Sequence, residues 1–102
     1  MATKFQESVY KLLKRIPKGR VTTYKEIARA LGRRGQIYRA VGRALHDNKT
    51  PIVIPCHRVV ASDSSIGGYS RGIKKKTALL KKEGVGIKNN KIIDFEKRLF
   101  RF

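Results

Sequence analysis

The segment Pro51-Ile-Val-Ile-Pro-Cys-His-Arg-Val-Val60 places the single cysteine of the chain, Cys56, directly before His57. Apolar residues precede and follow this pair, and a short apolar run bounded by breakers is typical of a buried strand or a buried turn. Because a proline cannot donate a hydrogen bond to a β-ladder, we expect the strand to end or bend at Pro55. The thiol is then predicted at the edge of the core, within reach of a substrate. A lone cysteine beside a histidine, in a chain without disulfides, is a candidate nucleophile.

Two plainer interpretations of this pair stay open. A lone cysteine is commonly a small buried hydrophobic residue, and a histidine next to it in sequence need not face it. Metal ligation is poorly supported, because Cys56, His57 and His46 match no usual spacing of zinc ligands. We therefore predict no metal site and no cofactor.

The charge of the chain is far from balanced. Its 102 residues include 25 Lys and Arg against 7 Asp and Glu, which gives a formal net charge of +18. Such a surplus repels itself and is usual in proteins that bind a polyanion. A ribosomal-type structural protein and a thermophile surface are the alternatives, but thermophile surfaces add Glu together with Lys, and Glu is scarce here. Nucleic acid is the predicted partner.

Length and composition predict one soluble domain. With 40% hydrophobic and 31% charged residues, a chain of this size can build one modest core. The start of the sequence lacks the apolar stretch of a signal peptide, and no run approaches the ~18 apolar residues that cross a bilayer. A single cysteine fits a reducing cytosol. We expect a cytoplasmic protein, nucleoid-associated if the source is prokaryotic, with no membrane partner.

Apolar residues at helical spacing predict three helices in the first half of the chain. The first follows Thr3, a good N-cap residue. The second follows Thr22 or Thr23, with Glu26 in the position of a capping box, and stops at Gly32. The third follows a tight basic turn. The residues predicted to face the core are Phe5, Val9, Leu12, Leu13, Ile16, Tyr24, Ile27, Ala28, Leu31, Ile37, Val41, Ala44 and Leu45.

The second and third helices have the pattern of a helix-turn-helix over about residues 23–47. Two short helices are joined by a few residues that include glycine, and the second helix is basic. Arg39 and Arg43 are like charges one turn apart on its outer face, a mildly destabilising pair unless an anion lies across it. Arg33 and Arg34 add charge to the turn. The alternative is an ordinary pair of core helices with a solvated basic face.

The remaining segments are predicted to surround the cysteine. Asn48 can lock the turn before it through side-chain hydrogen bonds to the backbone. A loop rich in Ser and Gly over residues 61–72 contains Tyr69, an unusual residue for a passive linker. A lysine-rich helix follows, then a small hairpin over 85–94 and a short helix over 95–102. Apolar positions mark the lysine-rich helix at Ile73, Thr77, Leu79 and Leu80, and the terminal helix at Phe95, Leu99 and Phe102.

The sequence Pro55-Cys-His-Arg-Val59, preceded by a helix-turn-helix, closely resembles the active-site domain of the O6-alkylguanine-DNA alkyltransferases. The resemblance covers about residues 5–84 and is highly specific, because further motifs stand in the family's order. It implies a mainly α fold: a winged helix-turn-helix-like alkyltransferase C-terminal domain with a small β-hairpin. This would be a single domain over 1–102, with its active-site segment at 51–60. The further motifs are Val21-Thr-Thr-Tyr24, Arg39-Ala-Val-Gly42, Asn48, Pro51, Gly68-Tyr-Ser70 and Glu83-Gly84.

The chain departs from the family pattern in two places. The N-terminal domain that the family usually carries has no counterpart here, and the segment after Glu83 is not one that we can match to the family. We expect a minimal form that relies on the active-site domain, with its high charge supplying affinity for DNA.

The resemblance implies a role for each matching residue of the reaction centre. Cys56 is implied as the alkyl acceptor, His57 as its base through a water molecule, and Glu83 as the group that orients the imidazole. Asn48 would brace the turn between the helix-turn-helix and the active site. Tyr24 would donate a proton or a hydrogen bond to the departing guanine. This arrangement repeats the nucleophile, base and orienting group of hydrolase triads.

The resemblance also implies which residues hold the base and the DNA. Tyr69 would line the pocket, and Ser70 would hydrogen-bond the O6 side of the purine. Arg39 would enter the duplex and fill the space left by the flipped nucleotide. The other implied pocket residues are Pro51, Val59 and Arg58, and the other implied DNA contacts are Arg33, Arg34, Tyr38 and Arg43.

The implied activity is repair of alkylated guanine in double-stranded DNA. An alkyl group on O6 lies inside the paired duplex, so the nucleotide has to be flipped out before a side chain can attack it. The family binds in the minor groove, which carries little sequence code, so we expect sequence-tolerant binding. Transfer would give a stable thioether, and we expect a monomer that is consumed in one turnover. The alternatives are a non-catalytic lesion binder, a helix-turn-helix regulator and, least favoured, a Cys-His hydrolase. Non-catalytic lesion binders of this scaffold replace the nucleophile.

Overall fold

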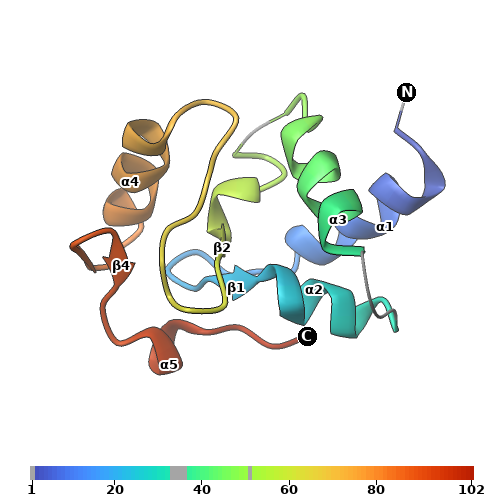
Figure 1. The fold of residues 1–102 in the computed structure, drawn as a ribbon. Coiled ribbons are helices and arrows are strands. Elements are labelled where there is room, and N and C mark those ends of the chain that lie inside the picture. Colours follow the sequence, from blue (N-terminus) through green and yellow to red (C-terminus); the bar gives the residue numbers. More distant parts are fainter. Residues whose placement is uncertain (1, 33–36, 51) are drawn as a thin grey trace.

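The structure is a computed structural model that describes residues 2–32, 37–50 and 52–102. Helices dominate this part of the chain, and four short strands and one 3-10 helix separate them (Figure 1). The α-helices are α1 (Lys4–Leu13), α2 (Tyr24–Ala30), α3 (Ile37–His46), α4 (Ile73–Lys82) and α5 (Phe95–Arg98). The strands are β1 (Thr22–Thr23), β2 (Val59–Val60), β3 (Ile87–Lys88) and β4 (Lys91–Ile92), and the 3-10 helix is η1 (Cys56–Arg58).

The first two helices begin at threonine caps. The hydroxyl of Thr3 accepts a hydrogen bond from the Gln6 amide at 3.1 Å, and the Gln6 side chain accepts one from the Thr3 amide at 3.1 Å, which completes a capping box. The hydroxyl of Thr23 accepts from the Glu26 amide at 3.1 Å. Both predicted helix starts are therefore confirmed, and of the two candidates Thr23 is the cap of α2.

Two hydrophobic clusters meet at the β1–β2 pair. The two strands are parallel, with Thr22 opposite Val59 and Thr23 opposite Val60. Because neighbouring residues of a strand point to opposite faces, Val59 packs into the first cluster and Val60 into the second. The first cluster also holds Val9, Leu13, Ile16, Ile27, Ala28, Ile37, Val41, Ala44, Leu45 and Cys56, and the second holds Val21, Ile66, Leu80, Val85 and Ile92.

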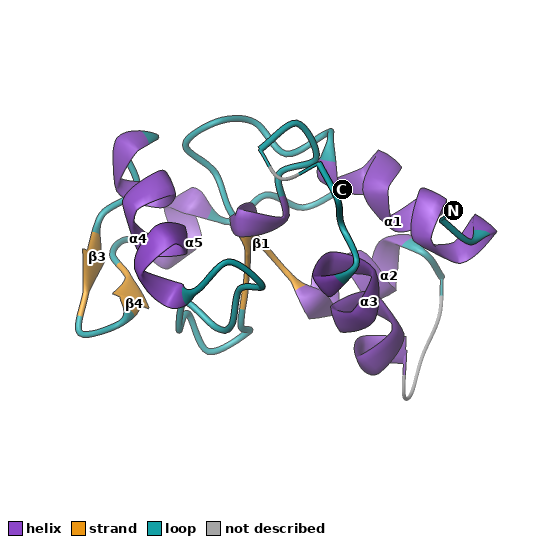
Figure 2. Ribbon diagram, turned by 90° about the horizontal axis from the view of Figure 1, so that it is seen from above, coloured by secondary structure: helices purple, strands orange, loops and turns teal. Residues whose placement is uncertain are grey.

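The helix-turn-helix and the hairpin lie at opposite ends of the molecule. Helices α1, α2 and α3 gather at one end, and α4, α5 and the β3–β4 hairpin at the other (Figures 1 and 2). The hairpin is confirmed: Ile87 pairs with Ile92, and Asn89 and Asn90 in its turn have φ of 52° and 60°, as a type I′ turn requires. It packs on the second cluster, so it does not flank α3.

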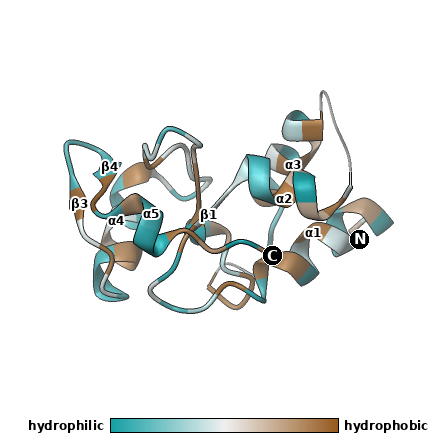
Figure 3. Ribbon diagram, turned by 90° about the horizontal axis from the view of Figure 1, so that it is seen from below, coloured by the Kyte–Doolittle hydropathy of each residue, from teal (hydrophilic) through white to brown (hydrophobic). Residues whose placement is uncertain are grey.

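Hydropathy follows burial along α1 and α3 but not along α4. Hydrophobic and hydrophilic residues alternate along α1 and α3 (Figure 3), as expected of helices with one buried face. In α4 the predicted Leu80 is buried, but Ile73, the first residue of the helix, is 52% exposed, whereas Lys76 is 1% exposed. Within the described ranges, no helix is both long and apolar enough to span a lipid bilayer.

The C-terminal residues differ from the prediction of a helix over 95–102. Helix α5 ends at Arg98, and the chain continues extended along Val21. The Val21 amide donates to the Arg98 carbonyl at 2.9 Å, and the Phe100 amide donates to the Val21 carbonyl at 2.6 Å. These ladder bonds take the place of helical ones, because they bring Phe100 and Phe102 against the first cluster, where burial of aromatic surface is favourable.

Candidate active site and DNA-facing surface

Cys56 begins η1, directly after the bend that Pro55 imposes on the chain. Its side chain is 4% exposed, and it lines a cavity of about 400 Å³ between α3 and the loop over residues 61–72. The predicted bend is therefore present, and the sulfur opens into space beside the basic helix. The other lining residues are Tyr24, Gly42, Leu45, His46, Gly68, Tyr69 and Ser70.

The imidazole of His57 is fully buried and is held by Glu83. Its Nε2 lies 3.1 Å from Oε2 of Glu83, so the carboxylate accepts the Nε2 proton and leaves Nδ1 as the basic nitrogen. Nδ1 is buried and has no hydrogen-bond partner among the described residues. Burial lowers the pKa of His57, and the hydrogen bond to Glu83 offsets part of this effect. The side chain is thus a neutral imidazole with a free lone pair, as a general base requires.

Arg58 anchors Glu83 on the other side of the carboxylate. Its Nε donates to Oε1 at 3.0 Å and its Nη2 to Oε2 at 2.6 Å, a bidentate pair. Its Nη1 donates to the Ile16 carbonyl at 2.8 Å. Burial acts to raise the pKa of Glu83, but hydrogen bonds from Arg58 and His57 outweigh burial and keep this pKa lowered. Arg58 therefore lies behind the imidazole and not in the Cys56 cavity, where the resemblance placed it.

Val59 is also set back from the cavity. Its side chain is fully buried in the first cluster. Its amide donates to the Cys56 carbonyl, and its own carbonyl accepts from Nζ of Lys76 at 2.7 Å. Because both main-chain groups already have partners, Val59 supports the cysteine segment and is not among the residues that line the cavity.

Two tyrosines face the sulfur of Cys56 across the cavity. The Tyr69 hydroxyl is buried and meets no partner at hydrogen-bond geometry in the part of the chain that the structure describes. Burial and then the nearby Cys56 raise the pKa of Tyr69. Burial followed by Cys56 also raises the pKa of Tyr24. Both phenols are therefore protonated at neutral pH and can donate. Ser70 lines the same cavity and is exposed.

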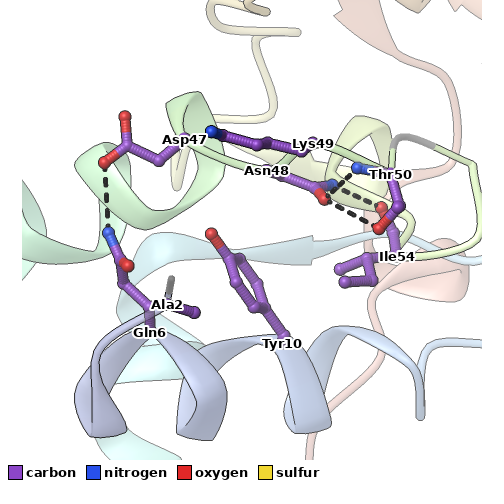
Figure 4. Close-up of a pocket in the computed structure, with 8 residues that line it drawn as sticks. All are labelled: Ala2, Gln6, Tyr10, Asp47, Asn48, Lys49, Thr50 and Ile54. Atoms are coloured by element: carbon purple, nitrogen blue, oxygen red, sulfur yellow. Dashed lines mark hydrogen bonds between the residues drawn. The ribbon is translucent and has the colours of Figure 1, made fainter.

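Asn48 locks the turn between α3 and the cysteine segment. Its Nδ2 donates to the Ile54 carbonyl at 2.8 Å, and its Oδ1 accepts from the Thr50 amide at 3.0 Å (Figure 4). These bonds tie the end of α3 to a residue just before Pro55, which is the geometry that a brace requires. A second cavity of about 510 Å³ adjoins this turn, with Tyr10 of α1 pointing into it.

The outer face of α3 carries the predicted DNA-binding residues. Tyr38, Arg39 and Arg43 are all exposed. Arg43 has its Nε 3.6 Å from Oδ2 of Asp47, which moderates its repulsion from Arg39. A shallow groove of about 550 Å³ runs along this face and shares two lining residues with the Cys56 cavity. The groove is lined by Tyr24, Tyr38, Arg39, Gly42, Ala61 and Ser62.

Three predicted site residues, Arg33, Arg34 and Pro51, lie outside the described residues. Within the ranges that the structure describes, no group of three or more metal-ligating side chains comes together.

Lys76 supports the candidate site but is not among the residues that the sequence predicts for it. It is buried, and its Nζ donates to the carbonyls of Val59 and Gly68 at 2.7 and 3.0 Å. A signal existed: Lys76 lies four residues before Leu80, on the same face of α4. The sequence alone gives little reason to single it out, because lysines are almost never fully buried.

The chain matches the family model for the DNA-binding domain of 6-O-methylguanine DNA methyltransferase over residues 4–85. The chain belongs to this family. A methylated-DNA–protein-cysteine methyltransferase of Saccharolobus islandicus (strain M.16.27) is 55% identical over 83 residues, which are 81% of this chain and 52% of that protein. The chain therefore spans about half the length of the curated relatives it matches.

Solved structures of family members share the fold. Mycobacterium tuberculosis OGT in complex with DNA has a TM-score of 0.77 and 43% identity, over 81% of this chain and 51% of that one. S. pombe Atl1, in complex with damaged DNA containing O6-carboxymethylguanine, has a TM-score of 0.82 and 29% identity over 100% of both chains. The likeness to Atl1 thus includes the C-terminal segment that the family model leaves out.

Proposed function

We propose that this protein repairs DNA by transferring the alkyl group of an O6-alkylguanine, flipped out of the duplex, to the sulfur of Cys56. The observation that carries the proposal is the position of this sulfur in a cavity beside α3, one residue before His57, whose imidazole Glu83 holds. Membership of the family and the DNA complexes of the similar structures support it.

DNA binding in the proposal uses the outer face of α3. The exposed basic residues of this helix face the phosphates, and contact in the minor groove makes binding tolerant of sequence. Extruding the nucleotide costs a few kcal/mol of stacking, and Arg39 offsets part of this cost by filling the vacated space. Because Tyr24 and Gly42 line both the groove and the Cys56 cavity, a base leaving the duplex along this groove enters the cavity directly.

The proposed transfer begins with the thiol proton, which passes through a water molecule to Nδ1 of His57. The thiolate then attacks the alkyl carbon: the S–C bond forms while the C–O6 bond breaks, and the released electron pair stays on the purine. Tyr24 donates its hydroxyl proton to the departing guanine, and the imidazolium of His57 passes its proton through solvent to the Tyr24 phenolate, so both side chains end neutral. Glu83 stabilises the imidazolium while it exists.

The product of this step is a thioether on Cys56. Water does not hydrolyse a thioether, so in the proposal each molecule accepts one alkyl group. The proposed protein acts as a monomer and requires no cofactor.

Intact mass measurement tests the proposal directly. After incubation with duplex DNA containing O6-methylguanine, the protein should gain one CH2 unit, and peptide mapping should place it on Cys56. The Cys56→Ala variant should gain nothing and should still bind the duplex. A mass gain on another residue, or the same gain in Cys56→Ala, would remove Cys56 from its role.

A second candidate function is lesion binding without transfer. The likeness to Atl1 over the whole chain favours it, because that protein is seen with DNA containing an alkylated guanine. In this case the wild-type protein would bind the O6-alkylguanine duplex more tightly than unmodified DNA and would gain no mass. A sequence-specific regulator would instead select one operator and ignore the lesion.

A further inference from the structure

Lys76 occupies a position that suits an apolar residue. Its side chain is 1% exposed, and in the described part of the chain no carboxylate lies within ion-pair distance of its Nζ. Burying an ammonium group without an anion is costly. A residue kept at such a cost usually has a function, because an apolar side chain at this position in α4 would avoid the cost of burying a charge.

The hydrogen bonds of Lys76 connect the two segments that enclose Cys56. Its Nζ donates to the carbonyl of Val59, which follows η1, and to the carbonyl of Gly68, which precedes Tyr69. One side chain therefore fixes the distance between the strand leaving Cys56 and the loop that carries Tyr69 and Ser70. The carbonyls are held at 2.7 and 3.0 Å, so the position of the loop depends on this ammonium group.

The charge of Lys76 acts on the groups of the reaction centre. Burial lowers the pKa of Lys76 to about 8, and Cys56 opposes this shift. The same charge helps to lower the pKa of His57. The other titratable groups around the sulfur are Tyr24 on α2, Tyr69 on the loop, Tyr10 on α1 and His46 on α3. Glu83 and Arg58 act on His57 from behind.

We propose that Lys76 is a positioning residue with two tasks: it sets the 61–72 loop over the cavity, and it provides the cation opposite the Cys56 thiolate. The first task needs only a donor at Nζ, and the second needs its positive charge. The inference rests on the proposed role of Cys56 as a nucleophile. Nζ of Lys76 is held by two neutral carbonyls and by no carboxylate of the described residues, so its positive charge is available to an anion formed on Cys56.

Two variants of Lys76 separate these tasks. Lys76→Gln keeps a donor without the charge, and Lys76→Met removes both at similar length. The first measurement is the rate of Cys56 alkylation by iodoacetamide, an uncharged probe, against pH and without DNA. We expect the midpoint of the rate profile to move upward in both variants, with a fall of about tenfold in rate at pH 7 for each unit of displacement. Lys75→Met, an exposed change of the same charge on α4, is the matched control and should keep the wild-type midpoint.

The second measurement is the saturable reaction with free O6-benzylguanine. Lys76→Gln should lower the maximal rate and leave half-saturation close to wild type, whereas Lys76→Met should also raise half-saturation several-fold. If both variants keep the wild-type midpoint of the iodoacetamide profile, the charge role is overturned. If Lys76→Met keeps the wild-type half-saturation, the role in placing the 61–72 loop is overturned. A third outcome is that the iodoacetamide midpoint shifts as expected while neither the wild type nor any variant reacts with alkylguanine. In that case the proposed function fails and this inference stands.

A measurement on Lys76 itself covers the case in which the variants do not fold. In the NMR titration of the Lys76 ammonium, the midpoint should fall when Cys56 is replaced by alanine, because the anion that favours the charged lysine is gone. An unchanged midpoint would show that the two groups do not interact and would overturn the charge role.

Discussion

At the scale of single residues, the candidate site depends on which hydrogen bonds each carboxylate oxygen of Glu83 accepts. Oε2 accepts from both His57 and Arg58, and Oε1 accepts from Arg58 alone. The carboxylate is therefore oriented by the guanidinium before it orients the imidazole. Arg58 also donates to the Ile16 carbonyl. The hydrogen bonds that fix the His57 tautomer therefore extend to the residues that follow α1.

Replacing Arg58 with glutamine should destabilise the protein by about 2–4 kcal/mol at neutral pH, since a nearly buried carboxylate loses its charged partner. The folded-state pKa of Glu83 is lowered from 4.5, so its stabilising contribution is complete above that pH and is lost as pH falls through the folded value. The difference between wild type and variant should shrink on acidification. Urea unfolding at about pH 7 and about pH 3 measures both values.

Arg58→Lys provides the control, because it keeps the charge and loses the bidentate geometry. It should fall between wild type and Arg58→Gln. Equal stability of all three proteins at neutral pH would contradict the anchoring role.

At the scale of elements, the local sequence predicted the helices, but it did not predict pairing between residues far apart in the chain. Thr3, Thr23 and the buried stripe of α3 are readable because caps and helical spacing act over three to seven residues. The main-chain bonds of Val21 reach Arg98 and Phe100, 77 and 79 residues away, and the side-chain bonds from Thr22 and Arg20 span 78 and 79 residues. Periodicity carries no signal at that distance, so the terminal strand was predicted as a helix.

Removing the Phe100 side chain tests this strand. Phe100→Ala should cost about 2 kcal/mol of stability, because a partly buried ring that packs on the first cluster is lost. Arg101→Ala, an exposed neighbour in the same strand, should cost about 0.5 kcal/mol or less. Denaturant midpoints compare the two, and an equal loss in both would mean that the strand does not stabilise the first cluster.

Helix α3 has the clearest functional prediction of any element. Arg39→Ala should reduce transfer from duplex DNA by about tenfold or more, since a few kcal/mol of unstacking is no longer offset. Transfer from the free base should stay within about twofold, because no nucleotide has to be flipped. Single-turnover rates on both substrates, with Lys11→Ala on α1 as the charge-matched control, measure the ratio. Equal losses on duplex and free base would argue against insertion.

At the scale of the whole molecule, the charge of +18 is expected to act with opposite signs on folding and on the proposed DNA binding. Salt screens the repulsion between lysines and arginines of the free protein. The same salt weakens contacts with phosphates by counterion competition. We expect Tm of the free protein to rise by several degrees between about 50 and about 300 mM NaCl, while affinity for DNA falls by orders of magnitude. A Tm that does not rise would mean that self-repulsion does not limit stability.

The site was predictable where a residue type and its neighbours in sequence define the chemistry. Cys56, His57 and Asn48 lie where the motif indicated. Arg58 was assigned to the pocket because it belongs to the cysteine motif, but the 3-10 helix η1 directs it toward Glu83. Lys76 was missed because burial of a lysine depends on carbonyls that only the folded loop brings together.

The extended residues after α5 bond to Val21, directly before β1, and Phe102 packs against the first cluster, so this segment is held against the core. Attaching a reporter protein there pulls on the same two-residue strand that pairs with the cysteine segment. Fusion partners for imaging or purification are therefore better joined ahead of Thr3, where the chain enters α1 from solvent.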